Sequence, residues 1–211
     1  MPDSLGYLSI NEQQKVISQL SGAAHRAPLR EKIFYSHGDK LTTATMLATS
    51  LVFWRSGFRA FNLNKFNRGR VGTLFVATAL SSVNGGFLHS WKVLNSLTDL
   101  YRSESMWTYG VRSVLVHQIA MFICFMSSCG YTFFTALRVG IIPVPIEVHK
   151  KGNRAIGIRH FVSALKPYGK TMAMTAALSS SIMFLIGLSE FKQSRALLAK
   201  INRKTLYFRE D

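Results

Sequence analysis

The chain has 211 residues, of which 48% are hydrophobic and 17% charged, and its 26 Lys and Arg against 10 acidic residues give a formal net charge of +16. On a water-soluble protein this charge would suggest a nucleic-acid ligand. The cations here fall in tails and loops, and no interleaved aromatic and basic residues form a stacking platform for bases. We therefore exclude a nucleic-acid partner and expect one domain over residues 1–211.

The first twenty residues predict a short amphipathic surface helix. Ser9 and Glu12 have the spacing of a capping box, and apolar residues follow at roughly helical intervals up to Leu20. No basic segment precedes an apolar core, so neither a secretory signal nor a usual cleaved transit peptide is expected.

Long gaps between charged residues are the main feature of the rest of the chain. Residues 71–91, 113–137 and 171–189 contain no charge and are 21, 25 and 19 residues long. About 20 apolar residues cross the roughly 30 Å of bilayer hydrocarbon as a helix. A fourth gap, residues 41–54, has 14 residues and extends to 41–61 if Arg55 and Arg59 reach back to the headgroups. The sequence predicts an all-α polytopic membrane protein, a four-transmembrane-helix bundle with spans at roughly 41–61, 71–91, 113–137 and 171–189.

The connections between these spans differ in charge. The first and third are basic, whereas the middle one, residues 96–110, is nearly neutral and has Trp107 and Tyr109 as interfacial anchors. The positive-inside rule then places the first and third connections inside and both tails outside. We expect these basic residues to contact anionic lipid such as cardiolipin: Arg55, Arg59, Lys65, Arg68, Arg70, Lys150, Lys151 and Arg154.

In the third connection, residues 142–145 read Ile-Pro-Val-Pro and predict an extended segment. Residues 155–165 predict a short amphipathic helix on the membrane. Pro167 is then expected near the first turn of the last span.

Few residues within the spans could perform chemistry. His89 and His117 could lie at similar depth, but no Asp or Glu lies in a span to complete a proton relay. Cys124 and Cys129 are five residues apart and point away from each other on a helix, which favours a packing role. No P-loop, GxGxxG, GxSxG or HExxH motif occurs. The sequence therefore predicts neither an enzyme nor a cofactor or metal site.

Small residues recur every fourth position in the spans, a pattern that lets helices approach closely in lipid. We predict that they pack helices inside the bundle, dock a partner, or do both; the alternatives stay open. The candidate packing or partner residues are Ala77, Ser81, Ser82, Gly85, Gly86, Ala176 and Ser180. The pairs Ala44 with Ala48 and Ala177 with Ser181 have the same spacing.

Residues 50–198 resemble the transmembrane protein 126 family of mitochondrial inner-membrane proteins, which act in assembly of respiratory complex I. The resemblance rests on these segments: Phe53-Trp54-Arg55, Asn62-Leu63-Asn64-Lys65, Arg112-Ser113, Gly152-Asn153, Lys166-Pro167 and Gly187-Leu188-Ser189-Glu190. The middle connection lacks the cysteines found in some relatives. The resemblance implies no catalytic residues.

The resemblance implies a multi-pass protein of the mitochondrial inner membrane that serves as a non-catalytic scaffold for complex I, as an assembly factor or as a stably bound accessory subunit. Its expected partners are hydrophobic membrane subunits of complex I or assembly intermediates. The alternative is a small-solute transporter of the inner membrane, although four spans without internal charge or repeat offer no visible transport path.

Overall fold

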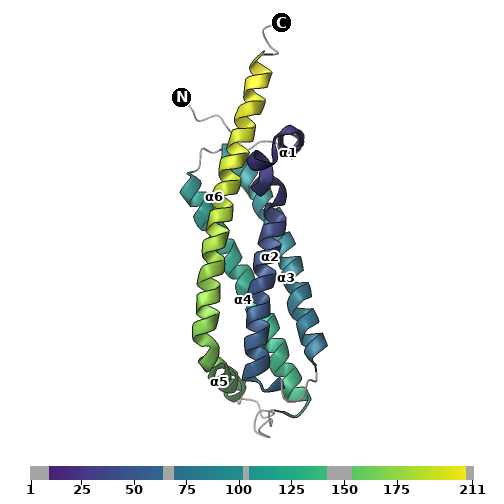
Figure 1. The fold of residues 1–211 in the computed structure, drawn as a ribbon, viewed down its shortest axis with the longest axis vertical. Helices are drawn as coiled ribbons and strands as arrows, with labels where there is room; N and C mark the ends of the chain where they lie inside the picture. Colours follow the sequence, from purple (N-terminus) through teal and green to yellow (C-terminus); the bar gives the residue numbers. More distant parts are fainter. Residues whose placement is uncertain (1–9, 64–68, 102–104, 142–153, 208–211) are drawn as a thin grey trace. The chain divides into compact units, whose positions relative to one another are not determined.

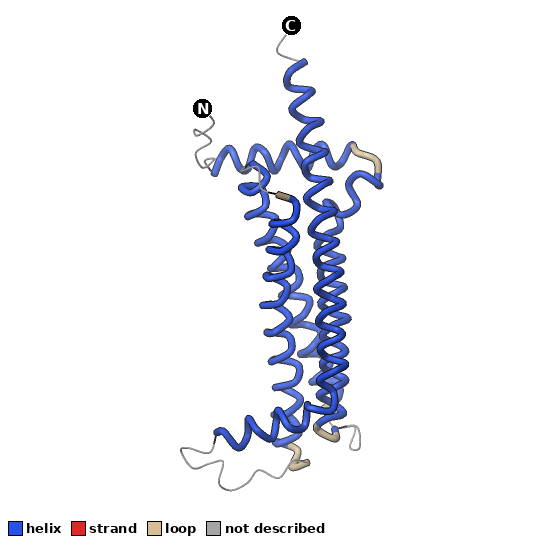
Figure 2. Tube along the Cα trace, turned by 90° about the vertical axis from the view of Figure 1, so that its left-hand side faces the viewer, coloured by secondary structure: helices blue, strands red, loops and turns tan. Residues whose placement is uncertain are grey.

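The computed structural model describes residues 10–63, 69–101, 105–141 and 154–207. Within these ranges the chain is helical and has no strand (Figures 1 and 2). The helices are α1 (Ile10–Arg26), α2 (Leu29–Ala60), α3 (Arg70–Tyr101), α4 (Met106–Arg138), α5 (Arg154–Leu165), the 3-10 helix η3 (Lys166–Tyr168) and α6 (Gly169–Tyr207). The prediction of an all-α chain is confirmed for the described residues.

Local backbone geometry explains where several helices end. α2 ends in a turn in which Asn62 has a φ of 57°, a left-handed conformation that asparagine tolerates better than most residues. After α4, Gly140 has a φ of 75°. The Ile141 N–H donates to the Ala136 carbonyl at 3.0 Å and the Gly140 N–H to the Leu137 carbonyl at 3.1 Å. These two bonds form a Schellman motif, which requires the left-handed glycine.

The four long helices contain the predicted spans, apart from Phe61, and extend beyond them. α2, α3, α4 and α6 have 32, 32, 33 and 39 residues. Residues 96–110 were predicted to connect two spans, and much of this segment is helical, since α3 continues to Tyr101 and α4 begins at Met106. The ends of the spans stay a prediction. Charged residues end a membrane span, but they are good helix formers and need not end a helix.

Two smaller predicted elements are present. The N-terminal helix is α1, and the helix predicted at residues 155–165 is α5. Pro167 lies in η3, two residues before α6 begins at Gly169. The predicted capping residue Ser9 and the predicted extended segment 142–145 lie outside the described residues.

The chain divides into two compact units, and the division falls inside all four long helices. Unit 1 consists of residues 1–42, 86–117 and 181–211, and unit 2 consists of residues 43–85 and 118–180. In unit 1, Leu20, Ala24 and Leu197 form a buried cluster that joins α1 to α6.

In unit 2, aromatic side chains form the core where α2 ends. The Phe61 ring lies 5.1 Å from Phe133 of α4 and 5.7 Å from Phe161 of α5. Phe133 and Phe161 are themselves 5.4 Å apart and nearly perpendicular. Such edge-to-face pairs add to the stabilisation from burial, so this aromatic cluster fixes α5 against α2 and α4.

Two helical stretches in the described chain are long and apolar enough to cross a membrane. They are Met106–Arg138, and Gly157–Ile201, which runs from α5 through η3 into α6. Only 39% and 28% of their most apolar windows are buried within the protein. A core helix of a water-soluble protein would be mostly buried, so the two stretches are candidate membrane spans.

Candidate functional site: an interhelical seam of small and hydroxyl residues

A row of small residues on α3 faces the interior of unit 2. Thr73, Ala77, Ser81 and Gly85 follow one another at intervals of four and are all buried. We call these four residues, together with Ser50 of α2 and Ser128 of α4, the interhelical seam. Residues four apart share one face of a helix, so α3 presents a continuous small face to its neighbours.

Hydrogen bonds tie the seam to α2. The Ser50 hydroxyl donates to the Ala77 carbonyl at 3.0 Å, and the Trp54 indole N–H donates to the Thr73 hydroxyl at 3.0 Å. Ser50 also lies 3.0 Å from the Ser128 hydroxyl. Because the single hydroxyl proton of Ser50 goes to Ala77, Ser128 must be the donor to Ser50. Three helices therefore meet at Ser50.

Gly85 marks the closest approach between α2 and α3. A Cβ atom at this position would lie 2.9 Å from the Thr43 Cα and 3.3 Å from the Thr43 Cβ. The first distance is below the range of real contacts and involves backbone, which cannot rotate away as a side chain can. Glycine is therefore required here by the proximity of the two helices rather than by a special φ.

Two cysteines extend the same type of contact to α4. The Ser81 hydroxyl lies 3.7 Å from the Cys124 sulfur, and the Cys129 thiol donates to the Phe53 carbonyl at 3.5 Å. Both thiols are buried and free. A Cβ on Gly57 would lie 2.8 Å from the Thr132 hydroxyl and 3.5 Å from the Cys129 Cα. The cysteines thus serve as small packing residues, as their spacing predicts.

Unit 1 contains a second close approach, between α4 and α6. The Ser113 hydroxyl donates to the Met183 carbonyl at 3.2 Å. A Cβ on Gly187 would lie 2.9 Å from the Ser113 Cβ, and one on Gly110 would meet the Phe184 ring at 2.6 Å. Gly57, Gly110 and Gly187 are not among the residues that the spacing predicts to pack. A glycine within a long helix costs about 1 kcal/mol relative to alanine, and that cost is a signal of close packing.

The predicted packing residues divide into three groups. Ala77, Ser81 and Gly85 are buried in the seam. Ala176 and Ser180 are half-buried on α6, where Gln118 of α4 donates to the Ser180 hydroxyl.

Ser82 is instead exposed and donates to the Thr78 carbonyl of its own helix at 3.0 Å. It lies at the edge of the buried face of α3, because it is turned about 100° around the helix axis from the buried Ser81. No burial is described for Gly86.

The predicted lipid-contacting residues lie at the surface where they are described. Arg55, Arg59 and Arg70 are exposed. Lys65, Arg68, Lys150 and Lys151 lie outside the described residues, and Arg154 begins α5 without a described side chain. Their proposed contact with headgroups stays a prediction.

The histidines provide no metal centre in the described part of the chain. His117 is 2% exposed in α4, while the side chain of His89 lies outside the described residues. Within those residues, no group of three or more His, Cys, Asp or Glu side chains could hold a metal ion. The pairing of His89 with His117 stays a hypothesis.

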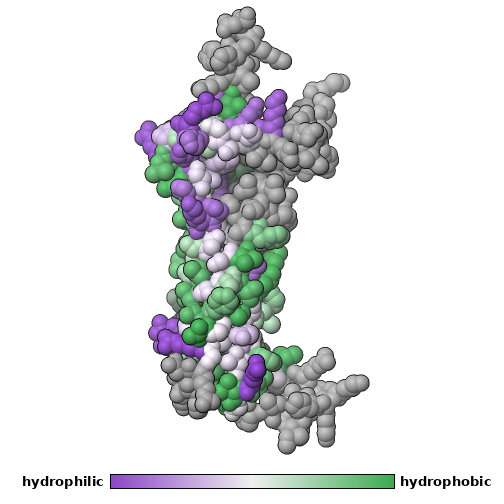
Figure 3. All heavy atoms as spheres, turned by 90° about the vertical axis from the view of Figure 1, so that its right-hand side faces the viewer, coloured by the Kyte–Doolittle hydropathy of each residue, from purple (hydrophilic) through white to green (hydrophobic). Residues whose placement is uncertain are grey.

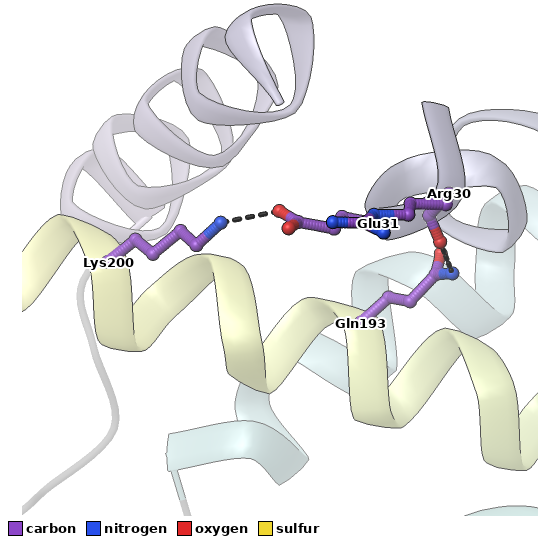
Figure 4. Close-up of polar contacts among 4 residues, drawn as sticks. All are labelled: Arg30, Glu31, Gln193 and Lys200. Atoms are coloured by element: carbon purple, nitrogen blue, oxygen red, sulfur yellow. Dashed lines mark hydrogen bonds and ion pairs between the residues drawn. The ribbon is translucent and has the colours of Figure 1, made fainter. Parts of the chain in front are cut away.

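A polar contact outside the predicted spans joins α2 to α6 (Figure 4). Gln193 donates through its amide nitrogen to the Arg30 carbonyl at 3.3 Å. Its amide oxygen accepts from the Phe34 N–H at 2.9 Å. These backbone groups are four residues apart, so Gln193 bridges one rung of the α2 hydrogen-bond ladder.

About two turns further along α6, Lys200 forms an ion pair with Glu31. The hydrogen bond from Lys200 holds the pKa of Glu31 below its ordinary value. Both side chains are partly exposed, so the pair is screened by solvent.

Comparison with protein-family models, curated proteins and solved structures found no match to this chain. The geometry therefore carries the functional argument. It contains close helix contacts, neutral hydroxyl groups and buried thiols.

Proposed function

We propose that this chain is a polytopic membrane protein whose four long helices cross the bilayer and form a non-catalytic scaffold for other hydrophobic subunits. The observation that carries the proposal is the polarity of α3. Its buried face is made of small and hydroxyl residues, whereas Val71, Phe75 and Val83 on its other side are 83%, 69% and 67% exposed. A helix of a water-soluble protein has the reverse arrangement.

Other helices expose large apolar side chains as well. Leu115, Ile119 and Phe122 of α4 and Met174, Leu178 and Leu185 of α6 are all at least 60% exposed. Figure 3 draws one face of the molecule and has hydrophobic side chains gathered over part of it. Water-soluble monomers rarely expose apolar patches of this extent. Lipid removes the cost of exposing them, which supports a membrane location.

Exposed small residues support docking of a partner helix. Ala44 and Ala48 of α2 are four residues apart and both exposed, and Ala173 and Ala177 of α6 repeat the arrangement. Small residues let a second helix approach its backbone closely in lipid. The exposed pair on α2, Ala44 and Ala48, is the surface that we propose receives an external helix.

The more specific proposal places the protein in the mitochondrial inner membrane, in contact with complex I or its assembly intermediates. It is supported by the resemblance of residues 50–198 to the transmembrane protein 126 family. In this proposal the exposed helix faces made of small residues bind hydrophobic partner subunits. Exposed cations such as Arg55 and Arg59 contact cardiolipin. No cofactor takes part.

Membrane integration is tested by extraction with alkaline carbonate. We expect the chain to stay in the membrane pellet, as an integral protein does. Release into the supernatant would refute the membrane proposal.

Double replacement of Ala44 and Ala48 by leucine should weaken co-purification of partner subunits, whereas Val71→Leu, at a lipid-exposed position, is the matched control.

The complex I proposal is tested by depletion. We expect assembled complex I and NADH-linked respiration to fall, with altered membrane-arm intermediates on native gels, while succinate-linked respiration is spared. An assembly factor would migrate only with intermediates, and an accessory subunit would also migrate with the mature complex. Normal complex I together with lost uptake of a metabolite would instead support the transporter.

A further inference from the structure

A groove of about 680 Å³ opens on unit 2 among α4, α5, η3 and the start of α6. Its walls include the half-buried rings of Phe125, Phe133 and Phe161, and its floor includes the buried Leu165. Lys166 is the one charged residue that lines the groove in the described part of the chain. From this groove we infer a binding site for one anionic phospholipid, with an acyl chain lying along the aromatic rings and the phosphate at Lys166.

The position of the lining residues along the chain fits a lipid in its normal orientation. The inference rests on the proposed membrane location. Phe125 is near the middle of the predicted span 113–137, and Phe133 is near its end. Lys166 precedes the predicted span 171–189 by five residues. The groove would therefore extend from the hydrocarbon toward the headgroup region, as an acyl chain does.

The charge near the groove favours a lipid with a net negative headgroup. Arg159, Lys166 and Lys170 are exposed, and residues 154–189 contain no Asp or Glu. An anionic headgroup gains about 1 kcal/mol for each nearby Lys or Arg at the membrane surface. A partner helix of ordinary apolar composition would gain nothing from Lys166, so the charge favours lipid over a partner helix.

Three glycines keep the groove open. Gly130, Gly157 and Gly169 line it, and a Cβ added to any of them would meet no atom within 4 Å. None of the three has a positive φ, so a larger residue would be placed without backbone strain. Such a residue would occupy space that the protein itself leaves empty. Gly130 and Gly157 are therefore positions at which the groove can be filled without displacing neighbouring side chains.

The experiment is native mass spectrometry of the full chain, purified in mild detergent and incubated with phosphatidylglycerol or phosphatidylcholine. The wild type should retain one phospholipid and prefer phosphatidylglycerol. Gly130→Leu and Gly157→Leu, each made separately, should lose both lipids. The matched control is Gly72→Leu on α3, where a Cβ also meets no atom within 4 Å, and it should retain lipid as the wild type does.

Lys166→Gln tests the headgroup contact and should reduce the preference for phosphatidylglycerol by about fivefold while an acyl chain is still retained. Carbonate extraction of every variant separates loss of this site from loss of membrane insertion. Equal lipid retention by Gly130→Leu, Gly157→Leu and Gly72→Leu would overturn the proposal. So would a wild type that retains no phospholipid, the result expected if a partner helix fills the groove.

Discussion

Replacing Gly85 with alanine adds one methyl group at the closest contact between α2 and α3. Its Cβ would lie 2.9 Å from the Thr43 Cα and 3.0 Å from the Thr43 hydroxyl. The hydroxyl can rotate away, but the Cα can move only with the α2 backbone. The two helices must therefore separate locally, which loosens the hydrogen bonds that Ser50 makes to Ala77 and Ser128.

The magnitude is best obtained as a difference between two variants in helix interiors. Gly130 lies inside α4 with no atom within 4 Å of an added Cβ, so Gly130→Ala supplies the same helix propensity without a clash. Alanine in a helix interior is favoured over glycine by about 1 kcal/mol. That contribution cancels when the free energies of unfolding of the two variants are subtracted. The remaining difference is the cost of overpacking at position 85, about 1–3 kcal/mol.

The assay is thermal unfolding of both purified variants in the same detergent, followed by loss of helical circular dichroism. For a chain of this size, 1 kcal/mol corresponds to about 2–4 °C in Tm. Gly85→Ala should therefore melt at least about 2 °C below Gly130→Ala. Equal melting temperatures would refute the argument that the backbone of Thr43 excludes a side chain at position 85.

Three further predictions follow from other contacts. Gln193→Leu removes the bridge to α2, so amide hydrogen exchange at Phe34 should rise by about fivefold, as the loss of one net hydrogen bond requires, with no change near Ala77. The ion pair of Glu31 with Lys200 stabilises the folded protein at pH values above the ordinary carboxyl pKa of 4.5, and this stabilisation is lost as the pH falls through the lowered pKa of the folded state. The difference in Tm between wild type and Glu31→Gln should therefore vanish in acid. A difference that stays constant with pH would contradict the assignment. Alanine at Ser50 and Ser128, singly and together, should give a coupling energy of about 0.6 kcal/mol in unfolding measurements.

The positions of the helices along the chain were largely predictable, because gaps between charged residues mark apolar stretches. The residues at which the helices begin and end were less predictable. α3 continues past Lys92 and Asp99 to Tyr101, since a charged side chain need not end a helix. The Schellman motif at Gly140 depends on a positive φ that several glycines in the chain could have adopted.

Which face of each helix is buried was only partly predictable. Ala77 and Ser82 both belong to rows of small residues in α3, yet the first is buried and the second exposed. The spacing of four fixes which residues share a face, but not which face meets α2. That choice depends on the hydrogen bond from Ser50 and the approach of Thr43, which involve residues distant in sequence.

Contacts of Gln193 with α2 were not predictable for the same reason. A glutamine in a charged segment is most often solvated, and nothing local indicates that it bridges Arg30 and Phe34 across more than 150 residues of chain. Gly57, Gly110 and Gly187 did carry a signal, since each interrupts a long helical stretch without ending it.

The arrangement in unit 2 also indicates which interactions hold such a protein together. If lipid covers the exposed apolar residues of α3, their contact with the interior would add little, because hydrocarbon and protein interior are then similarly apolar. Stability would come from dispersion across the close contact of Gly85 with Thr43 and from neutral hydrogen bonds such as Ser50 to Ala77. These interactions depend steeply on distance, whereas the exposed apolar side chains tolerate exchange among themselves. A bundle held in this way leaves its outer apolar surface free to meet other membrane components, which is the property that a scaffold requires.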